Sequence, residues 1–298
     1  MGAAILTSFL FALSAIFGSR SAKIFGSFTA NMGRVVIALI LLALWALTFG
    51  KGLSGVGIYW LIISGCVGFG FGDMALFGAL PRIGPRLSLL LTQCLAGPIA
   101  GWVEWLWLGQ TISLAEIFCG AAILIGVAMA LLPNGIIPTP RFFWAGVGFG
   151  ILSALGQGMG AAISRKANEI NLAAGTQIDG GTAAFQRMLG GFFVTALFIL
   201  IANRSRKAPV RARISGKLPS GWHNILLNGL VGPSLGVGFY QYALSTTPSA
   251  IVLAIVATSP VIVMILQFFL GEEKPSVISV CGACVAVGGA AILATLKN

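Results

Sequence analysis

Apolar residues follow one another along this chain in long runs that polar residues interrupt at short intervals. Segments of about 20 predominantly apolar residues, the length of helix that crosses the hydrocarbon core of a bilayer, recur along the whole sequence. Glycine, proline and charged residues separate most of them, as at Pro133-Asn134-Gly135. The pattern predicts an all-α integral membrane protein with ten transmembrane helices, at residues 3–18, 32–49, 57–80, 87–108, 112–132, 143–163, 184–202, 222–244, 249–270 and 276–296.

The composition supports a membrane protein and narrows its class. Hydrophobic residues make up 57% of the chain and charged residues 8%, against about 25% charged residues in soluble domains, and the mean hydropathy is +0.98. The net charge of +11 does not indicate a nucleic-acid partner, because the basic residues lie between apolar runs and form no face interleaved with aromatic residues. We predict a multi-pass protein of a bacterial cytoplasmic (inner) membrane.

The second half of the chain repeats the first. Gly68 and Gly72 match Gly232 and Gly236, 164 residues further along, and the segments around Pro98 and Pro260 match at a shift of 162. We therefore predict two five-helix units, at residues 1–133 and 142–298. Because five is odd, the second unit enters the membrane upside down relative to the first, and such inverted repeats are the architecture of many secondary transporters.

The motifs of the two units, taken in order, resemble a known family. Pro98 is followed by Leu108-Gly109-Gln110 and Pro260 by Leu270-Gly271-Glu272; in each unit an arginine near the start of the second helix and a glycine-rich third helix precede them. This set is similar to the tandem EamA domains of the drug/metabolite transporter superfamily over essentially the whole chain. The resemblance implies transport, more often export, of amino acids, related organic solutes or drugs. It departs from the family at Gln110, where glutamate is commoner, so only Glu272 supplies that acid.

The basic residues predict an orientation. The connections on one side carry Arg20, Lys23, Arg82, Arg86, Arg141, Arg204, Arg206, Lys207, Arg211, Arg213, Lys217 and Lys274, against Lys51, Arg165, Lys166 and Lys297 on the other. The positive-inside rule therefore places both termini outside and the basic 203–221 loop in the cytoplasm. The family resemblance implies cytoplasmic termini instead.

Asp73 and Glu104, two of the seven acidic residues, lie well inside predicted helices. An ionised carboxylate at that depth costs about 3 kcal/mol or more unless it is paired, neutral or hydrated, so each asks for a functional reason. We expect Asp73 to couple transport to protons. The alternative for Asp73 is a structural role, as a cap of a backbone break or as the partner of a basic residue such as Arg34 or Arg187. Glu104 can instead extend toward the interface.

Further candidates for the binding region are polar residues and prolines within the spans. Arg34 and Arg187 are expected at the mouths of apolar helices, where each can attract an anionic group such as a substrate carboxylate or anchor the helix at the interface. Pro98 and Pro260 are expected to interrupt their helices as hinges that free backbone carbonyls. Polar residues at such breaks mark binding regions in transporters, although hydroxyl groups can merely satisfy the kink. The candidate lining residues are Thr92, Gln93, Gln157, Asn228, Tyr240, Gln241, Thr258 and Ser259.

Small residues recur every four positions in two of the helices and predict close helix packing. The two ridges are Gly146, Gly150, Ala154, Gly158 and Ala162, and Gly282, Ala286, Ala290 and Ala294. The Cys281-Gly-Ala-Cys284 motif has no second cysteine pair or histidine nearby and is interpreted as packing. The sequence contains no metal-ligand cluster, cofactor motif or catalytic constellation, so we expect neither a metal, nor a cofactor, nor enzymatic activity.

The whole pattern predicts a secondary transporter that works by alternating access between its two units. The expected partners are a small-molecule solute, membrane lipids and protons, and the expected assembly is a monomer or homodimer. Two other functions fit the sequence. One is a flippase for lipids or lipid-linked sugars, in which the 203–221 loop would hold anionic headgroups. The other is a membrane interaction subunit that transports nothing.

Overall fold

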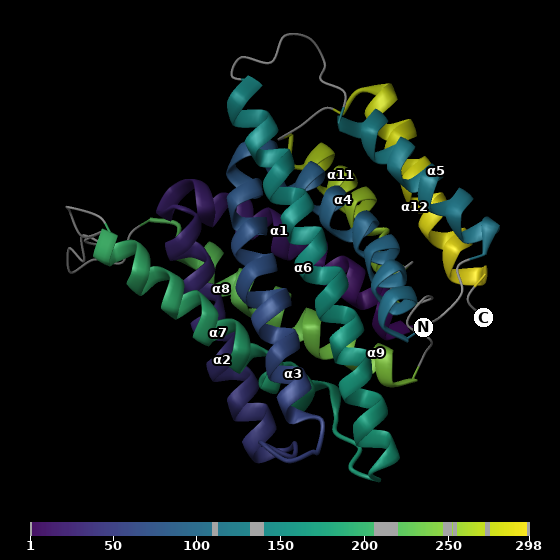
Figure 1. Cartoon of the computed structure of the whole chain (residues 1–298). Helices are drawn as coiled ribbons and strands as arrows, with labels where there is room; N and C mark the ends of the chain where they lie inside the picture. Colours follow the sequence, from purple (N-terminus) through teal and green to yellow (C-terminus); the bar gives the residue numbers. More distant parts are fainter. Residues whose placement is uncertain are drawn as a thin grey trace.

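The fold is helical throughout the part of the chain that can be described (Figure 1). The computed structural model describes residues 2–108, 113–131, 140–205, 220–246, 252, 255–271 and 275–296. Within these residues the predicted all-α class is confirmed, and five helical stretches are long and apolar enough to cross a membrane: Gly2–Phe25, Ser27–Thr48, Ile58–Trp107, Pro140–Ala173 and Gly180–Ile201. The count of ten spans and the inversion of the second unit stay predictions.

The first predicted unit begins with α1 (Gly2–Phe25) and α2 (Ser27–Thr48), which meet at Gly26. The third predicted span consists of α3 (Ile58–Gly65), a π-helical stretch η1 (Cys66–Gly72) and the first part of α4 (Asp73–Leu108). α4 bends at Gly84, whose φ of 73° suits glycine because it has no Cβ. The rest of α4 forms the fourth predicted span, and α5 (Leu114–Leu131) follows.

The second predicted unit has a similar order of elements. It consists of α6 (Pro140–Ala173), α7 (Gly180–Ser205), α8 (Trp222–Gly229), a second π-helical stretch η2 (Leu230–Gly236), α9 (Val237–Thr246), α11 (Ser259–Phe269) and α12 (Val277–Leu296). Pro260 lies in the first turn of α11, where its missing N–H costs no hydrogen bond. The interruption predicted at Pro98 is not found, since Gly84 is the residue with non-helical backbone angles in α4.

The two π-helical stretches are equivalent in the sequence repeat, because Cys66 and Leu230 are 164 residues apart. The backbone N–H of Asp73 bonds to the carbonyl oxygens of Gly68 and Gly70, and the N–H of Val237 bonds to those of Gly232 and Ser234. The repeat therefore extends to individual backbone hydrogen bonds. π-helical turns frequently lie at functional sites, and Asp73 follows this one directly.

The first helix of each predicted unit packs against helices of the other unit. α1 packs against α8, η2 and α9 of the second unit, whereas α6 packs against α3, η1 and α4 of the first. α5 and α12 run side by side (Figure 1). The third predicted span of each unit thus packs against the first helix of the other unit, which brings residues of both units into contact.

The predicted small-residue ridges do form packing seams. A Cβ at Gly150 would lie 2.5 Å from Leu91 Cδ1, and a Cβ at Gly158 would lie 2.8 Å from the carbonyl oxygen of Ala96, so α6 sits closely on α4. A Cβ at Gly282 would lie 2.5 Å from the backbone nitrogen of Ala130, which fixes α12 against α5. The side chains of Ala290 and Ala294 lie outside the described part of the structure.

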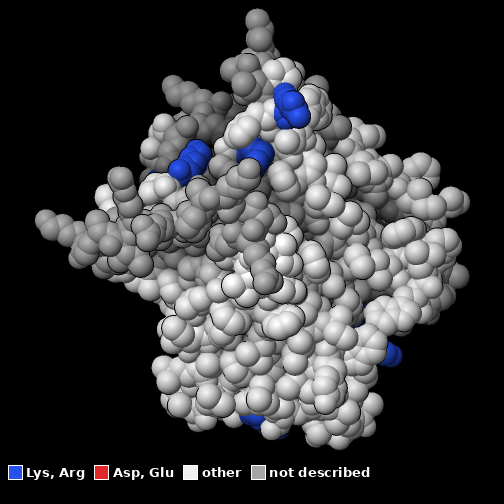
Figure 2. Space-filling model, turned by 60° about the vertical axis from the view of Figure 1, so that its left-hand side comes forward, with Lys and Arg blue, Asp and Glu red and all other residues white. Residues whose placement is uncertain are grey.

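The described part of the surface is uncharged over the middle of the visible face. In Figure 2 the described lysine and arginine side chains lie toward the upper and lower parts of that face, and the described residues between them carry no charge. Large apolar side chains such as Ile40, Leu44, Phe193 and Leu200 are exposed on the helices. Such a belt suits contact with lipid acyl chains and agrees with an integral membrane protein.

Asp179 joins two helices at the start of α7. Its Oδ1 accepts hydrogen bonds from the backbone N–H of Thr182 (2.9 Å) and from Nε1–H of Trp45 in α2 (3.0 Å). Partial burial acts to raise the pKa of Asp179, but the hydrogen bonds from Thr182 and Trp45 outweigh it and hold this pKa below its ordinary value. Asp179 therefore caps α7 as a carboxylate.

The variant Asp179→Ala is expected to lower the free energy of unfolding by about 1 kcal/mol at pH 7, the usual effect of losing an N-cap. A carboxylate with a depressed folded-state pKa stabilises the fold above its unfolded pKa of about 3.9, and this contribution is lost as the pH falls through the folded value. Unfolding measured from pH 7 down to pH 3 should therefore show the two proteins converging at acid pH. Glu169→Ala, which removes a surface carboxylate 3.4 Å from Arg165, is the control and should change stability by less than about 0.5 kcal/mol. A wild-type advantage that does not depend on pH would contradict the capping role of the charge.

Candidate functional site

A cavity lies between the two predicted units and is lined by residues of both. The space in and around it that no protein atom fills amounts to about 780 Å³, open solvent at its mouth included. The first unit contributes α1, α2, η1 and α4, and the second contributes α6, α7, α8, η2 and α9. Its polar lining residues are Ser14, Arg34, Asp73, Thr92, Gln93, Gln157, Arg187, Asn228 and Tyr240. Most of the polar residues singled out in the sequence therefore meet in one place.

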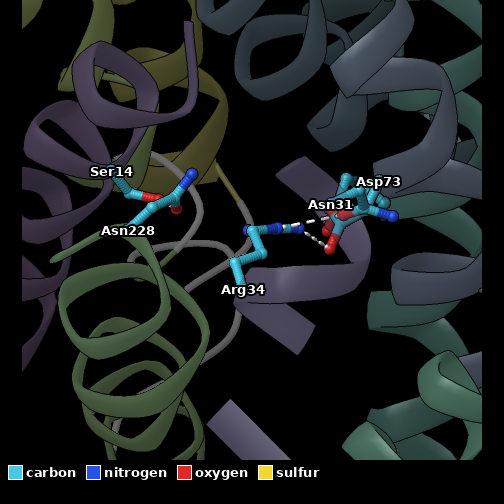
Figure 3. A network of polar contacts seen from close by, with 6 residues as sticks. Ser14, Asn31, Arg34, Asp73 and Asn228 are labelled. Carbon is cyan, nitrogen blue, oxygen red and sulfur yellow. Dashed lines mark hydrogen bonds and ion pairs between the residues drawn. The ribbon is translucent and has the colours of Figure 1, made fainter. Parts of the chain in front are cut away.

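A buried ion pair connects α2 and α4 in this cavity (Figure 3). Nη2 of Arg34 donates to Oδ2 of Asp73, and only 5% of Arg34 and 3% of Asp73 are exposed. Nε of Arg34 donates to Oδ1 of Asn31, one turn earlier in α2, at 3.0 Å. The guanidinium also lies over the ring of Phe77, 4.7 Å from its centroid.

The other oxygen of Asp73 is bound from the second unit. Nε2 of Gln157 in α6 donates to Oδ1 of Asp73 at 3.1 Å. Both carboxylate oxygens thus have donors, which a buried charge needs if the ion pair is to offset the cost of leaving water. Asp73 thus has the cationic partner that we expected of an acid at membrane depth. Of the two basic residues considered from the sequence, Arg34 is the one that pairs with it in this structure.

Arg187 brings a second guanidinium to the cavity. Only 3% of it is exposed, and it lies over the ring of Phe69, 4.9 Å from the centroid. Its Nε is buried and has no hydrogen-bond partner, and no acceptor for its other nitrogens is found in the described part of the chain. A Cβ at Gly68 would lie 3.2 Å from Nη2 of Arg187, so the absence of a side chain at position 68 makes room for the guanidinium itself.

The predicted positions of the two arginines need correction. α2 begins at Ser27 and α7 at Gly180, so Arg34 and Arg187 each lie seven residues inside their helices and not at the mouths. In α7 the apolar run starts later than the helix, because its first turn consists of the small and polar residues Gly180, Gly181, Thr182 and Ala183. The burial of both side chains does not fit an anchoring role at the membrane surface.

Two further polar contacts line the cavity. Oγ of Ser14 in α1 donates to Oδ1 of Asn228 in α8 at 2.7 Å (Figure 3). Nδ2 of Asn228 is buried without a partner, and so is Oγ1 of Thr92 in α4. Gln93 and Tyr240 complete the predicted residues that line the cavity.

The remaining predicted residues lie elsewhere. Thr258 and Ser259 are not among the cavity residues, and their hydroxyl groups donate to the carbonyl oxygens of Ile255 and Val256, both at 2.6 Å. Both hydroxyl groups therefore bind backbone carbonyls just before α11, which corrects the prediction that they line the site. Gln241 is buried outside the cavity lining. Glu104 lies in α4, but its side chain, together with Gln110, Glu272 and most of the 203–221 loop, is outside the described residues.

The sequence reading missed residues that hold the charged groups in place. Asn31, Ser14, Phe69 and Phe77 were not predicted to belong to the site. Phe69, Asp73 and Phe77 recur every four residues, and Asn31 precedes Arg34 by three, so helical spacing could have placed them on common faces. Among the described residues, no group of three or more histidine, cysteine, aspartate or glutamate side chains could hold a metal ion.

Comparison with solved structures supports the fold. A crystal structure of another protein matches with a TM-score of 0.60 and 18% sequence identity, covering 97% of this chain and 96% of the other. At that identity the match shows a shared fold. A search of curated proteins found no match.

Comparison with protein families gives the same result as the ordered motifs. The EamA-like transporter family matches this sequence twice, over residues 1–132 and 144–295. Its members are transporters of the drug/metabolite superfamily, and the apolar helices agree with an integral, multi-pass membrane location. The tandem resemblance predicted from the motifs is therefore confirmed, and the chain belongs to the EamA-like transporter family.

Proposed function

We propose that this protein is a secondary transporter, working as an exporter, that moves a small organic solute such as an amino acid through the cavity between its two units. The observation that carries the proposal is the cavity itself: it is lined by both units and contains a buried ion pair and a second guanidinium. Charged groups at membrane depth are costly and are retained where they serve a substrate or ion pathway.

Alternating access requires that the solute site lie between two bodies that can move relative to each other. Arg34 and Asp73 come from the first unit, and Gln157 and Arg187 from the second, so relative motion of the units would change the site directly. Close glycine contacts between the units support such motion: a Cβ at Gly156 of α6 would lie 2.5 Å from Cα of Gly72. Smooth backbone surfaces of this kind allow helices to slide without side chains interlocking.

Asp73 is the group that we propose to carry a proton. Among the described residues that line the cavity, Asp73 is the one with an acidic side chain, and its carboxylate binds Arg34. Protonation would remove the charge that holds Arg34, and deprotonation would restore it. A proton taken up by Asp73 on one side of the membrane and released on the other would therefore link the position of Arg34 to the direction in which the cavity opens.

The test is transport by the full-length protein in proteoliposomes. Counterflow of a panel of amino acids and other small organic solutes is measured with and without a pH gradient. We expect a subset of solutes to exchange, a pH gradient to accelerate their net movement, and Asp73→Asn to abolish this acceleration while leaving residual exchange. Glu169→Gln, an exposed acid outside the cavity, is the matched control and should behave as the wild type.

Two results would count against different parts of the proposal. Unchanged pH dependence in Asp73→Asn would show that Asp73 does not carry the proton. A folded wild-type protein that exchanges no solute of the panel would contradict the transport function itself.

A further inference from the structure

The cavity carries an excess of positive charge. Its described lining residues include two guanidinium groups, Arg34 and Arg187, and one carboxylate, Asp73. Arg34 and Gln157 take the two carboxylate oxygens, and among the described contacts no hydrogen bond joins Asp73 to Arg187. A buried guanidinium without a bound anion is costly. This cost indicates that Arg187 binds an anionic group from outside the protein.

Three buried atoms of the cavity lining have no hydrogen-bond partner: Nε of Arg187, Nδ2 of Asn228 and Oγ1 of Thr92. The first two are donors, because Ser14 donates to the amide oxygen of Asn228, and the hydroxyl of Thr92 can also donate. Both oxygens of Asp73, in contrast, already accept hydrogen bonds. Acceptor atoms on a ligand would satisfy all three unpaired groups.

The aromatic faces lead to the same conclusion. An amine could be held over an aromatic ring, but the ring of Phe69 is already covered by Arg187 and that of Phe77 by Arg34. Elsewhere the lining includes apolar side chains such as Leu76 and Leu89 and the ring of Phe11. These surfaces suit the hydrocarbon body of an organic molecule.

We propose that the cavity selects small organic oxyanions, and that Arg187 binds their charged end. This inference rests on the proposed transport function and names its substrate class. A carboxylate or a phosphonate offers two or more oxygens to the planar guanidinium fork, which binds such groups bidentately. Asn228 and Thr92 line the same cavity and supply further hydrogen-bonding groups, and the apolar part of the lining receives the organic body.

The test measures binding to the purified full-length protein in lipid nanodiscs. Four probes share one ring and differ in the end group: phenylacetate, phenylphosphonate, phenylacetamide and phenethylammonium. Titration calorimetry is expected to show the anions binding about tenfold or more tighter than the amide, with the ammonium weakest, because hydrogen bonds to charged groups are the stronger ones. The two anions distinguish a carboxylate site from a phosphonate-type site.

The variant Arg187→Gln should lose about tenfold or more in affinity for the preferred anion and change the affinity for phenylacetamide by less than about twofold. Arg187→Lys keeps the charge without the planar fork and should give an intermediate affinity. Arg82→Gln is the matched control, because Arg82 also lies over an aromatic ring, 4.9 Å from the centroid of Phe149, but does not line the cavity. It should bind all four probes as the wild type does.

The unfolding temperature without ligand shows whether each variant is folded. If Arg187→Gln is unfolded, the four-probe series on the wild-type protein still tests the inference. Amide or ammonium binding as tight as that of the anions would overturn it, and so would the absence of binding by any probe. If the protein in proteoliposomes exchanges only neutral or cationic solutes, the proposed transport function is supported and the anion selectivity is contradicted. If the protein binds the anions but exchanges no solute, the anion selectivity is supported and the transport function is contradicted.

Discussion

Replacing Asp73 with asparagine is expected to lower the free energy of unfolding by about 3 kcal/mol or more, because removal of one partner of a buried ion pair leaves the other charge uncompensated. Arg34 would keep its hydrogen bond to Asn31 and its contact with the ring of Phe77 but would lose its carboxylate. Arg187 would lose the same negative charge. Two uncompensated guanidinium groups would then share one buried cavity.

Replacing Arg34 with glutamine should cost less than removing Asp73. Asp73 would keep the hydrogen bond from Gln157 and the attraction of Arg187, so its charge would stay partly compensated. The double variant R34Q/D73N replaces the ion pair with two neutral amides. It is expected to lie within about 2 kcal/mol of the wild type, since exchanging a whole buried ion pair for neutral groups is far milder than breaking it.

A double-mutant cycle measures this coupling. The free energies of unfolding of the wild type, both single variants and the double variant are obtained by denaturant titration in mixed micelles. The exposed pair of Arg165 and Glu169, 3.4 Å apart, provides the control cycle, with a coupling of less than about 0.5 kcal/mol. Additive effects of R34Q and D73N would show that the two side chains are not coupled, which would contradict a stabilising role of the ion pair.

The sequence predicted the charged residues of the site better than their partners. An acid inside an apolar run is visible without a structure, and so are arginines at corresponding places in the two units. Position alone could not decide between Arg34 and Arg187 as the partner of Asp73, because the repeat makes them equivalent. The choice is made by packing, which places Arg34 at the carboxylate and Arg187 over Phe69.

Local backbone geometry was the weaker part of the prediction. η1 and η2 look like ordinary apolar helix in the sequence, because one extra residue per turn does not change the hydrophobicity of a run that is apolar on all sides. Pro98 indicated a break, but the non-helical backbone angles in α4 are those of Gly84, and the helix continues through Pro98. Pro260 stands in the first turn of α11, where a proline interrupts no helix.

Replacing Gly65 with alanine is expected to have an effect as large as the loss of Asp73. A Cβ at position 65 would lie 1.7 Å from the backbone carbonyl oxygen of Arg187, and a Cβ at Gly190 would lie 2.1 Å from that of Ile62. The two glycines therefore interlock α3 and α7 backbone to backbone, and no flexible side chain can move to make room. Overpacking of this kind costs about 1 to 3 kcal/mol and more where the backbone must shift. The shift would also displace the residue that carries the second guanidinium of the cavity.

Gly148→Ala in α6 is the control for this substitution, because a Cβ at position 148 meets nothing within 4 Å. Alanine favours helix over glycine by up to about 1 kcal/mol, so Gly148→Ala should be neutral or stabilising. The two variants differ in the space around the new methyl group, and unfolding in mixed micelles together with the yield of monodisperse protein compares them. Equal stability of Gly65→Ala and Gly148→Ala would mean that α3 and α7 do not approach as closely as the structure has them. A folded Gly65→Ala protein with weakened binding of the anionic probes would instead show that this contact sets the position of Arg187, because position 65 itself does not line the cavity.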